Sequence, residues 1–116
     1  MIITLDDGKA NVVGHALLNE LFPALERAET EAKAVLIVGR TGIFSAGFDL
    51  KELKKGPAES RALVSRGYEL LYRLYGFPLP VVSACTGHCI GLGAFILLAS
   101  DMRIGMAGDS KISLPE

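Results

Sequence analysis

This chain has few residues of the kinds that bind metals, and neither sign of charge is in clear excess. Its 116 residues include two cysteines, Cys85 and Cys89, and two histidines, His15 and His88. A structural zinc site needs more ligands than these residues offer, so we expect no metal site and two buried free thiols. The formal net charge of −1 argues against a nucleic-acid partner and against binding to an anionic membrane.

The chain also lacks a segment that would direct it to or through a membrane. Residues 1–7 contain no basic region and no long apolar run, so we expect no signal peptide. The most apolar stretch, residues 90–99, is far shorter than the ~20 residues that span a bilayer. These absences predict a cytoplasmic protein with no membrane contact.

The overall composition is that of a folded domain. Half of the residues are apolar and 22% are charged, and 116 residues are enough for one small domain with its own core. The sequence ends on Leu114-Pro115-Glu116 without the exposed residues that usually trail off at a terminus. We therefore expect the domain to continue beyond residue 116.

Apolar periodicity predicts strands that alternate with helices. Strands are expected over residues 2–5, 34–39 and 81–85, with weaker candidates over residues 102–106 and 111–113. The run over residues 34–39 is continuously apolar, which is typical of a strand buried on both faces. This alternation favours parallel strands joined by right-handed crossovers, and hence an α/β fold.

Four helices are expected between these strands. One covers residues 15–32 around an internal Pro23, and a short one begins at a capping Asp49 and ends near Lys54. A longer helix then runs until Pro78 and Pro80 stop it, and its apolar side is formed by Leu63, Val64, Leu70, Leu71, Leu74 and Tyr75. The fourth, over residues 91–99, is apolar all round, so we expect it to be buried.

Two glycine-rich turns, each expected between an apolar strand and a helix, are the most informative feature. The first is Phe44-Ser45-Ala46-Gly47-Phe48-Asp49-Leu50, after residues 35–38, and the second is Gly87-His88-Cys89-Ile90-Gly91-Leu92-Gly93-Ala94, after residues 81–84. Such a turn leaves backbone N–H groups free at the positive end of a helix. Two of them close together can hold one oxygen atom from two sides, which is an oxyanion hole.

The second turn also permits a nucleotide-binding interpretation. Thr86-Gly87-x-x-x-Gly91-x-Gly93 matches the dinucleotide motif of short-chain dehydrogenases, and Asp109 lies where a ribose-binding acid is expected. That motif normally follows the first strand of its domain, whereas here it comes late. The chain also contains no Tyr-x-x-x-Lys pair, so an NAD-binding protein remains the weaker alternative.

Three further features have ordinary structural interpretations. Ser45 lacks the leading glycine of a nucleophile elbow, so we expect a turn serine that bonds its own backbone. His88 is expected to be exposed or hydrogen-bonded locally. Lys51, Glu52, Lys54 and Lys55 are expected to form a solvated face, although two of these lysines could also meet the phosphates of a ligand.

The first turn, continued through Lys51-Glu52-Leu53, resembles the acyl-CoA-binding turn of the enoyl-CoA hydratase/isomerase (crotonase) family. The segments from Pro80-Val81-Val82-Ser83-Ala84 through Gly91-Leu92-Gly93 to Asp101-Met102-Arg103-Ile104 resemble the family's second motif, and Leu114-Pro115-Glu116 resembles its third. The resemblance implies a ββα spiral (superhelix) fold, truncated here, with residues 1–116 as the N-terminal part of one domain. It also implies an acyl-CoA thioester as substrate, no cofactor beyond the coenzyme A of that substrate, and assembly as homotrimers or hexamers.

The resemblance also assigns roles to individual residues. The N–H groups of Phe48 and Leu92 would form the oxyanion hole, and Glu116 matches one of two catalytic glutamates of the hydratases. Contacts to the substrate would come from the residues of both turns and from an N-terminal strip, namely Ala46, Gly47, Asp49, Leu50, Gly91, Phe95, Lys9 and Ala10.

Two departures from the family pattern bear on the reaction. Leu92 replaces a common glycine but keeps its N–H, and Phe95 stands where the second hydratase glutamate is expected. One carboxylate in an apolar wall suits a proton shuttle better than water addition, so we expect double-bond isomerisation. Hydration or another enolate reaction with an acid from beyond residue 116, and a non-catalytic acyl-CoA-binding subunit, remain alternatives.

Overall fold

The computed structural model describes residues 1–114 and contains two parallel β-sheets. The four-stranded sheet has the order β1-β2-β4-β6, from β1 (Ile2–Thr4), β2 (Val35–Val38), β4 (Val81–Cys85) and β6 (Met102–Gly105). The three-stranded sheet has the order β3-β5-β7, from β3 (Gly42–Ser45), β5 (Gly87–Ile90) and β7 (Ile112–Ser113). All pairings between these strands are parallel, as the α/β expectation requires.

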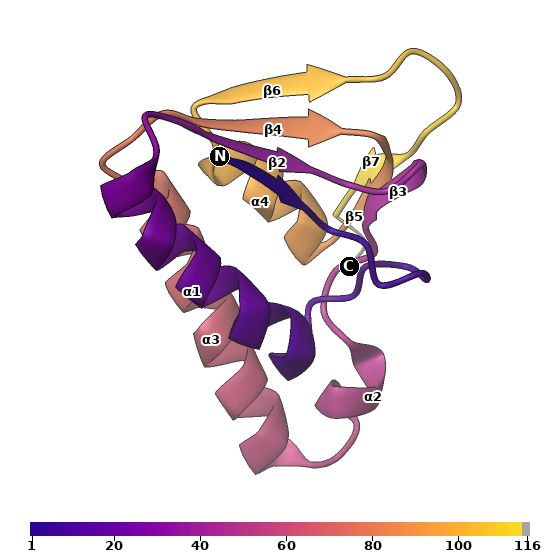
Figure 1. Cartoon of the computed structure of the whole chain (residues 1–116). Helices are drawn as coiled ribbons and strands as arrows, with labels where there is room; N and C mark the ends of the chain where they lie inside the picture. Colours follow the sequence, from indigo (N-terminus) through magenta and orange to yellow (C-terminus); the bar gives the residue numbers. More distant parts are fainter. Residues whose placement is uncertain (115–116) are drawn as a thin grey trace.

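Four helices lie on one side of the larger sheet or beside its end (Figure 1). The helices α1 (His15–Glu31) and α3 (Pro57–Tyr75) run side by side, and α4 (Leu92–Ala99) lies between α3 and the sheet. The short α2 (Leu50–Leu53) precedes α3. The expected bounds of α1 are met to within one residue, and α1 continues through Pro23, which is exposed.

The chain alternates between the two sheets in a regular way. β2, β4 and β6 belong to the larger sheet, and each is followed directly by a strand of the smaller one, β3, β5 or β7. A helical segment then leads back to the larger sheet after β3 and after β5. This repeated ββα order is the spiral that the resemblance implied.

The expected positions of the glycine turns need a correction. Each turn includes part of a strand of the smaller sheet, because β3 extends into the first turn at residues 44–45 and β5 forms residues 87–90 of the second. These strands are four residues long and are held by long-range pairing, such as Gly42 with Gly87, which local periodicity does not reveal.

One core joins both sheets and three of the helices. It contains Leu18, Leu25, Val35, Ile37, Phe44, Leu63, Leu70, Leu74, Val81 and Ile96, all with at most 1% of their surface exposed. Val35 and Ile37 are buried while Leu36 and Val38 are half-buried, so β2 is fully covered on one face only.

The expectation that β2 is buried on both faces was therefore wrong, and so were two others. Tyr75 was placed on the apolar side of α3, yet it is 81% exposed because it projects to the outer side of the last helical turn. The helix α4 was expected to be buried all round, yet Phe95 and Leu98 are 42% and 60% exposed. The buried residues of α4 face the two sheets and α3, and the described residues leave the remaining side open.

Within residues 1–114, no helix combines the length and the apolar character needed to cross a membrane.

Candidate functional site

The two glycine turns meet at Gly47 and Gly91, and both glycines adopt positive φ. Gly47 has φ +93°, and Gly91 has φ +59° with ψ −124°. A Cβ atom at Gly47 would lie 2.8 Å from the carbonyl oxygen of Ile90 and 3.3 Å from the backbone nitrogen of Leu92. Because no side chain fits in this space, glycine at position 47 is what allows the two backbones to approach.

The backbone on each side of Phe48 is tied to Val13. The N–H of Val13 donates to the Gly47 carbonyl over 2.7 Å, and the N–H of Asp49 donates to the Val13 carbonyl over 3.0 Å. Successive peptide groups of an extended segment point to opposite sides, so the N–H of Phe48 points away from Val13.

Both N–H groups assigned to the oxyanion hole are available to a ligand. Leu92 is the first residue of α4, where an N–H has no acceptor within the helix. Among residues 1–114, neither the N–H of Phe48 nor that of Leu92 donates a hydrogen bond. Backbone donors of this kind are already oriented and need no rearrangement when negative charge develops on a bound oxygen.

The side chains of these two residues are held together by a glycine of α3. A Cβ atom at Gly67 would lie 2.5 Å from Cζ of Phe48 and 3.1 Å from Cδ2 of Leu92. The absence of a side chain at Gly67 therefore leaves a notch in the surface of α3, and the side chains of Phe48 and Leu92 pack into it. Sequence reasoning missed Gly67, although a glycine on the apolar side of a predicted helix signals close packing.

Ser45 supports the first turn rather than acting as a nucleophile. Its hydroxyl is buried, donates to the Asn11 carbonyl over 2.8 Å and accepts from the N–H of Gly47 over 3.2 Å. The bond to Gly47 is the local turn bond expected from the sequence. Gly93 at the start of α4 packs directly on Ser45, since a Cβ there would lie 2.7 Å from the Ser45 carbonyl oxygen.

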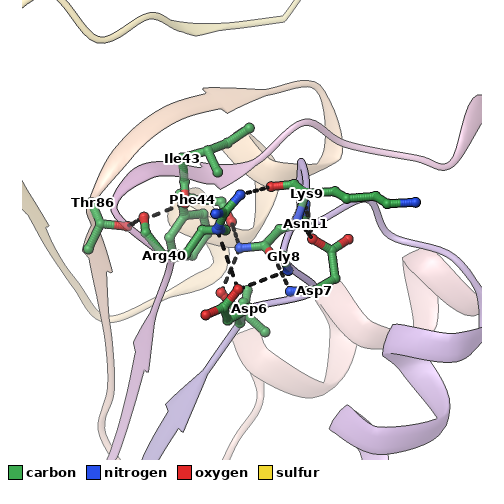
Figure 2. A network of polar contacts seen from close by, with 10 residues as sticks. Asp6, Asp7, Gly8, Lys9, Asn11, Arg40, Ile43, Phe44 and Thr86 are labelled. Atoms are coloured by element: carbon green, nitrogen blue, oxygen red, sulfur yellow. Dashed lines mark hydrogen bonds and ion pairs between the residues drawn. The ribbon is translucent and has the colours of Figure 1, made fainter.

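The N-terminal strip lies beside the first turn, in a network of polar contacts (Figure 2). The Ala10 carbonyl accepts from the N–H of Ala46 over 3.0 Å, and the Lys9 carbonyl accepts from Arg40 Nη1 over 2.6 Å. Figure 2 shows the Lys9 side chain extending away from this network. Lys9 and Ala10 thus share one region with Ala46 and Gly47, as the resemblance implied.

Asp7 and Asn11 hold this strip in place. The Asp7 carboxylate accepts from the N–H of Lys9 over 2.7 Å and from that of Asn11 over 3.1 Å. Burial acts to raise the pKa of Asp7, but these backbone hydrogen bonds outweigh it and hold the pKa below its usual value. Sequence reasoning missed Asn11, although asparagine is one of the few residues that tolerate positive φ.

The turn continues into α2, whose start is capped as expected. Oδ1 of Asp49 accepts from the N–H of Lys51 over 3.0 Å, and Leu50 is exposed beside it. Lys55 pairs with Glu52 over 2.9 Å, and this hydrogen-bonded carboxylate raises the pKa of Lys55. The charge run is the solvated face that the sequence predicted.

Phe95 lies one helical turn beyond Gly91, to whose carbonyl its N–H donates over 3.3 Å. Its ring is partly exposed and is therefore free to meet another group. Glu116, the acid expected beside it, lies outside the described residues.

The remaining candidates form no second site. Nδ1 of His88 accepts from the N–H of Lys111 over 3.0 Å, so this exposed histidine is bonded locally as expected. Cys85 and Cys89 are buried free thiols, and burial together with the neighbouring Cys85 raises the pKa of Cys89 to about 12. No group of histidine, cysteine and acidic residues within residues 1–114 is arranged to hold a metal ion.

Neither of two hollows in the described residues is lined by Phe48 or Leu92 themselves. One, of about 570 Å³, lies between β1, the start of α1 and α2, reaches the first turn at Asp49, and is also lined by the acidic residues Asp6, Asp7, Glu20 and Glu52. This concentration of negative charge disfavours phosphate groups. The other, of about 410 Å³, is an apolar groove beside α4, β6 and β7.

The sheet arrangement does not favour the dinucleotide alternative. A dinucleotide-binding domain places its strands in one doubly wound sheet, with the glycine motif after the first of them. Here the motif, residues 86–93, begins after β4 and contains β5, a strand of the smaller of the two sheets.

Comparison with known proteins agrees with this geometry. Residues 1–116 match the family model of enoyl-CoA hydratase/isomerase. The chain is 36% identical over 119 aligned residues to a probable enoyl-CoA hydratase of Bacillus subtilis, an alignment that covers 99% of this chain and 46% of that protein.

Solved structures of the family share the fold. The chain matches an enoyl-CoA hydratase/isomerase family protein from Pseudomonas syringae with a TM-score of 0.95 and 37% identity, over 97% of this chain and 49% of that one. It matches an enoyl-CoA hydratase from Mycobacterium ulcerans with a TM-score of 0.84 and 44% identity, over 88% of this chain and 46% of that one.

The chain thus spans about half the length of these relatives. The family model covers it throughout, and the two-sheet spiral that brings the glycine turns together is common to the solved structures. This chain belongs to the enoyl-CoA hydratase/isomerase family and has the crotonase fold.

Proposed function

We propose that this chain binds an acyl-CoA thioester and stabilises its enolate through the N–H groups of Phe48 and Leu92. The observation that carries the proposal is the meeting of the two turns at Gly47, with both N–H groups unpaired within residues 1–114. The names of the relatives, probable enoyl-CoA hydratase among them, support the same class of substrate.

The chemistry needs only oriented donors and a base. Removal of the proton next to the thioester carbonyl moves negative charge onto the carbonyl oxygen. Two fixed N–H groups stabilise that oxygen more strongly in the transition state than in the ground state, and one such donor is worth about 3 kcal/mol. In our proposal the reaction uses no cofactor, because coenzyme A enters as part of the substrate.

The rest of the substrate would lie along the first turn and the N-terminal strip. Ala46, Gly47, Asp49 and Leu50 would contact the coenzyme A portion, and Lys9 and Ala10 beside them would line the same part of the site. The hydrogen bond between the Ala46 N–H and the Ala10 carbonyl supports this assignment, because it keeps the two segments together. We also propose assembly as trimers or pairs of trimers.

The reaction we favour is the shift of a C3–C4 double bond to C2–C3. Glu116 would remove a proton from C2 and, as the acid formed in that step, return it to C4, so that no water is consumed. Phe95, in place of a second acid, supports a site that excludes water from the intermediate. Leu92 and Phe48 would hold the thioester oxygen throughout.

Hydration is the second candidate, and the names of the relatives favour it. A Bacillus subtilis relative is a probable enoyl-CoA hydratase, and relatives from Salmonella are carnitinyl-CoA dehydratases. Water addition would require a second acid near the thioester, which Phe95 does not supply. Assays of the protein with 3-enoyl-CoA and with 2-enoyl-CoA separate the two reactions, because only hydration consumes the 2-enoyl double bond.

Binding of two matched ligands tests the proposal itself. Butyryl-CoA and its thioether analogue, S-butyl-CoA, differ only in the carbonyl oxygen that the two N–H groups would hold. Calorimetry should show tighter binding of butyryl-CoA and no binding of NADH. Equal affinity for the two coenzyme A ligands would contradict the oxyanion hole, and binding of NADH alone would favour the dinucleotide alternative.

A further inference from the structure

Asn11 has an unusual backbone conformation and uses every polar atom of its side chain. Its φ is +51°, and among residues 1–114 it is the one non-glycine residue with positive φ. It is also fully buried. Holding a side-chain-bearing residue in this region costs free energy, so the surrounding structure must compensate for it.

The compensation comes from three side-chain hydrogen bonds, two to the loop that follows β1 and one to β3. Figure 2 shows Asn11 beside Asp7 and Phe44. Nδ2 donates to the Leu5 carbonyl over 2.6 Å and to the Phe44 carbonyl over 3.1 Å. Oδ1 accepts from the N–H of Asp7 over 2.9 Å. The carboxamide therefore joins the loop after β1 to Phe44 in β3, the residue from which the first glycine turn begins.

The residues around Asn11 continue this attachment along the turn. The Asn11 carbonyl accepts from the Ser45 hydroxyl, and the Ala10 carbonyl accepts from the N–H of Ala46. Two residues later, Val13 bonds both Gly47 and Asp49. The segment of residues 10–13 thus lies along residues 44–49, and the last contacts are those that turn the Phe48 N–H away from Val13.

The backbone conformation at Asn11 sets where Val13 can lie. A residue at position 11 without these bonds would no longer be held at this φ, and the direction of the chain before residues 12 and 13 would no longer be fixed. Val13 would then no longer meet both Gly47 and Asp49, and the peptide between them would be free to rotate. The N–H of Phe48 would lose its fixed direction even though Phe48 itself is unchanged.

We propose that Asn11 is a positioning residue, whose carboxamide fixes the direction of the Phe48 N–H through Val13. This inference rests on the proposed function, because it concerns the donor that would hold the thioester oxygen. Asn11 itself touches no reacting atom. Substitution of Asn11 should therefore weaken the preference for a ligand with a thioester carbonyl over one without it, and should leave the affinity for the coenzyme A portion unchanged.

Two substitutions test the role of the carboxamide. Asn11→Asp keeps the size and one acceptor oxygen but removes both donated hydrogen bonds, and Asn11→Gly removes the side chain while still tolerating positive φ. Asn19→Asp is the matched control, because Asn19 is exposed on α1 and its Oδ1 accepts from Arg66 over 2.8 Å, a bond that aspartate retains.

The measurement is the ratio of affinities for butyryl-CoA and S-butyl-CoA. Both Asn11 variants should reduce this ratio by about tenfold, because small misplacements of an oriented group are costly. Their affinity for S-butyl-CoA should stay within about twofold of the wild-type value. The backbone amide resonance of Phe48 in an NMR spectrum should shift in both variants, and Asn19→Asp should change neither readout.

Each other outcome overturns a specific claim. If the wild-type protein does not prefer butyryl-CoA, the proposed function fails and this inference fails with it. If the wild-type protein does prefer it and the ratio is unchanged in the Asn11 variants, only the positioning role is overturned. An equal fall in affinity for both ligands, or unfolding of both variants, would overturn the positioning role. Either result would mean that Asn11 maintains the fold or the N-terminal strip instead.

Discussion

The ring of Phe48 lies against Gly67, at a point of α3 where any side chain would occupy the same space. The glycine therefore joins the helix to the turn whose backbone N–H is one of the two candidate oxyanion donors. A glycine inside a helix costs roughly 1 kcal/mol relative to alanine. The close packing of Phe48 against the helix gives a reason for glycine at this position in spite of that cost.

Alanine at this position should destabilise the protein despite its better helix propensity. In Gly67→Ala the new Cβ would lie 2.5 Å from Cζ of Phe48 and 3.1 Å from Cδ2 of Leu92. Overpacking of this kind costs about 1–3 kcal/mol and the helix propensity of alanine offsets about 1 kcal/mol, so we expect the free energy of unfolding measured with urea to fall by up to about 2 kcal/mol. Gly76→Ala is the control, because a Cβ there meets only the Tyr72 carbonyl at 3.5 Å, and equal losses in both variants would contradict the notch.

Proline at position 92 should remove the backbone N–H donor without disrupting α4. Leu92 is the first residue of α4, a position at which proline is accepted. Both Leu92→Pro and Leu92→Ala lose the buried side chain, so their comparison isolates the N–H. We expect turnover of Leu92→Pro to be about 10²–10³ times slower than that of Leu92→Ala. Equal rates in two variants with native circular dichroism would place Leu92 outside the oxyanion hole.

Glutamine at position 116 should abolish isomerisation and leave binding nearly unchanged. In Glu116→Gln the side chain keeps its size but cannot accept the proton from C2, so the loss belongs to the transition state. Absorbance kinetics on 3-enoyl-CoA measure the rate, and calorimetry with butyryl-CoA measures the affinity. A variant that isomerises at the wild-type rate would show that another residue is the base.

Glutamate at position 95 tests whether the lack of a second acid at this position is what prevents hydration. Phe95→Glu places a second acid where the hydratases carry one, and it should add weak water addition to 2-enoyl-CoA. The cost to stability should be moderate, because Phe95 is already partly exposed. Phe95→Gln is the control, and water addition that is equal in the two variants would exclude a role for the new carboxylate.

The buried thiol pair should make the protein sensitive to alkaline pH. The folded protein keeps Cys89 as a neutral thiol with a pKa of about 12, whereas an unfolded cysteine has a pKa of about 8.5. The unfolded state therefore loses this proton first, and the stabilisation is present below about pH 8.5 and is lost progressively as the pH rises toward 12.

Urea unfolding of the wild-type protein and of Cys89→Ala between pH 7.5 and 10.5 measures this effect by difference. The free energy of unfolding should fall more steeply with pH in the wild type, since the variant has no thiol at position 89. Parallel curves would show that Cys89 titrates normally in the folded state. The native thiol should also resist alkylation at pH 8, because the neutral form is a poor nucleophile.

Local patterns predicted a large part of the fold. The helix at residues 15–31 and the strands β2 and β4 follow from apolar spacing, and the cap at Asp49 follows from a side chain and an N–H two residues apart. The short strands β3 and β5 could not be predicted in this way. They are recognised as strands only because they pair with each other across more than forty residues.

The same division holds for the candidate site. The glycine turns and the free N–H of Leu92 at the start of α4 follow from residues that are neighbours in the sequence, and the quoted motifs identify the family. The contacts that orient those groups join residues distant in the sequence, such as Val13 with Gly47 and Gly67 with Phe48. No periodicity records such a contact, so Asn11 and Gly67 emerged only from the structure.

By itself, the sequence determined which segments are helical and where the backbone can turn, because each depends on a few adjacent residues. The tertiary structure alone decided that β2 and β4 each continue into a second sheet, and that this sheet brings Gly47 against Leu92. It also decided that one side of α4 stays open within residues 1–114. The physical reason is that burial and close approach depend on which distant surfaces meet, whereas propensity and capping act within one turn of the chain.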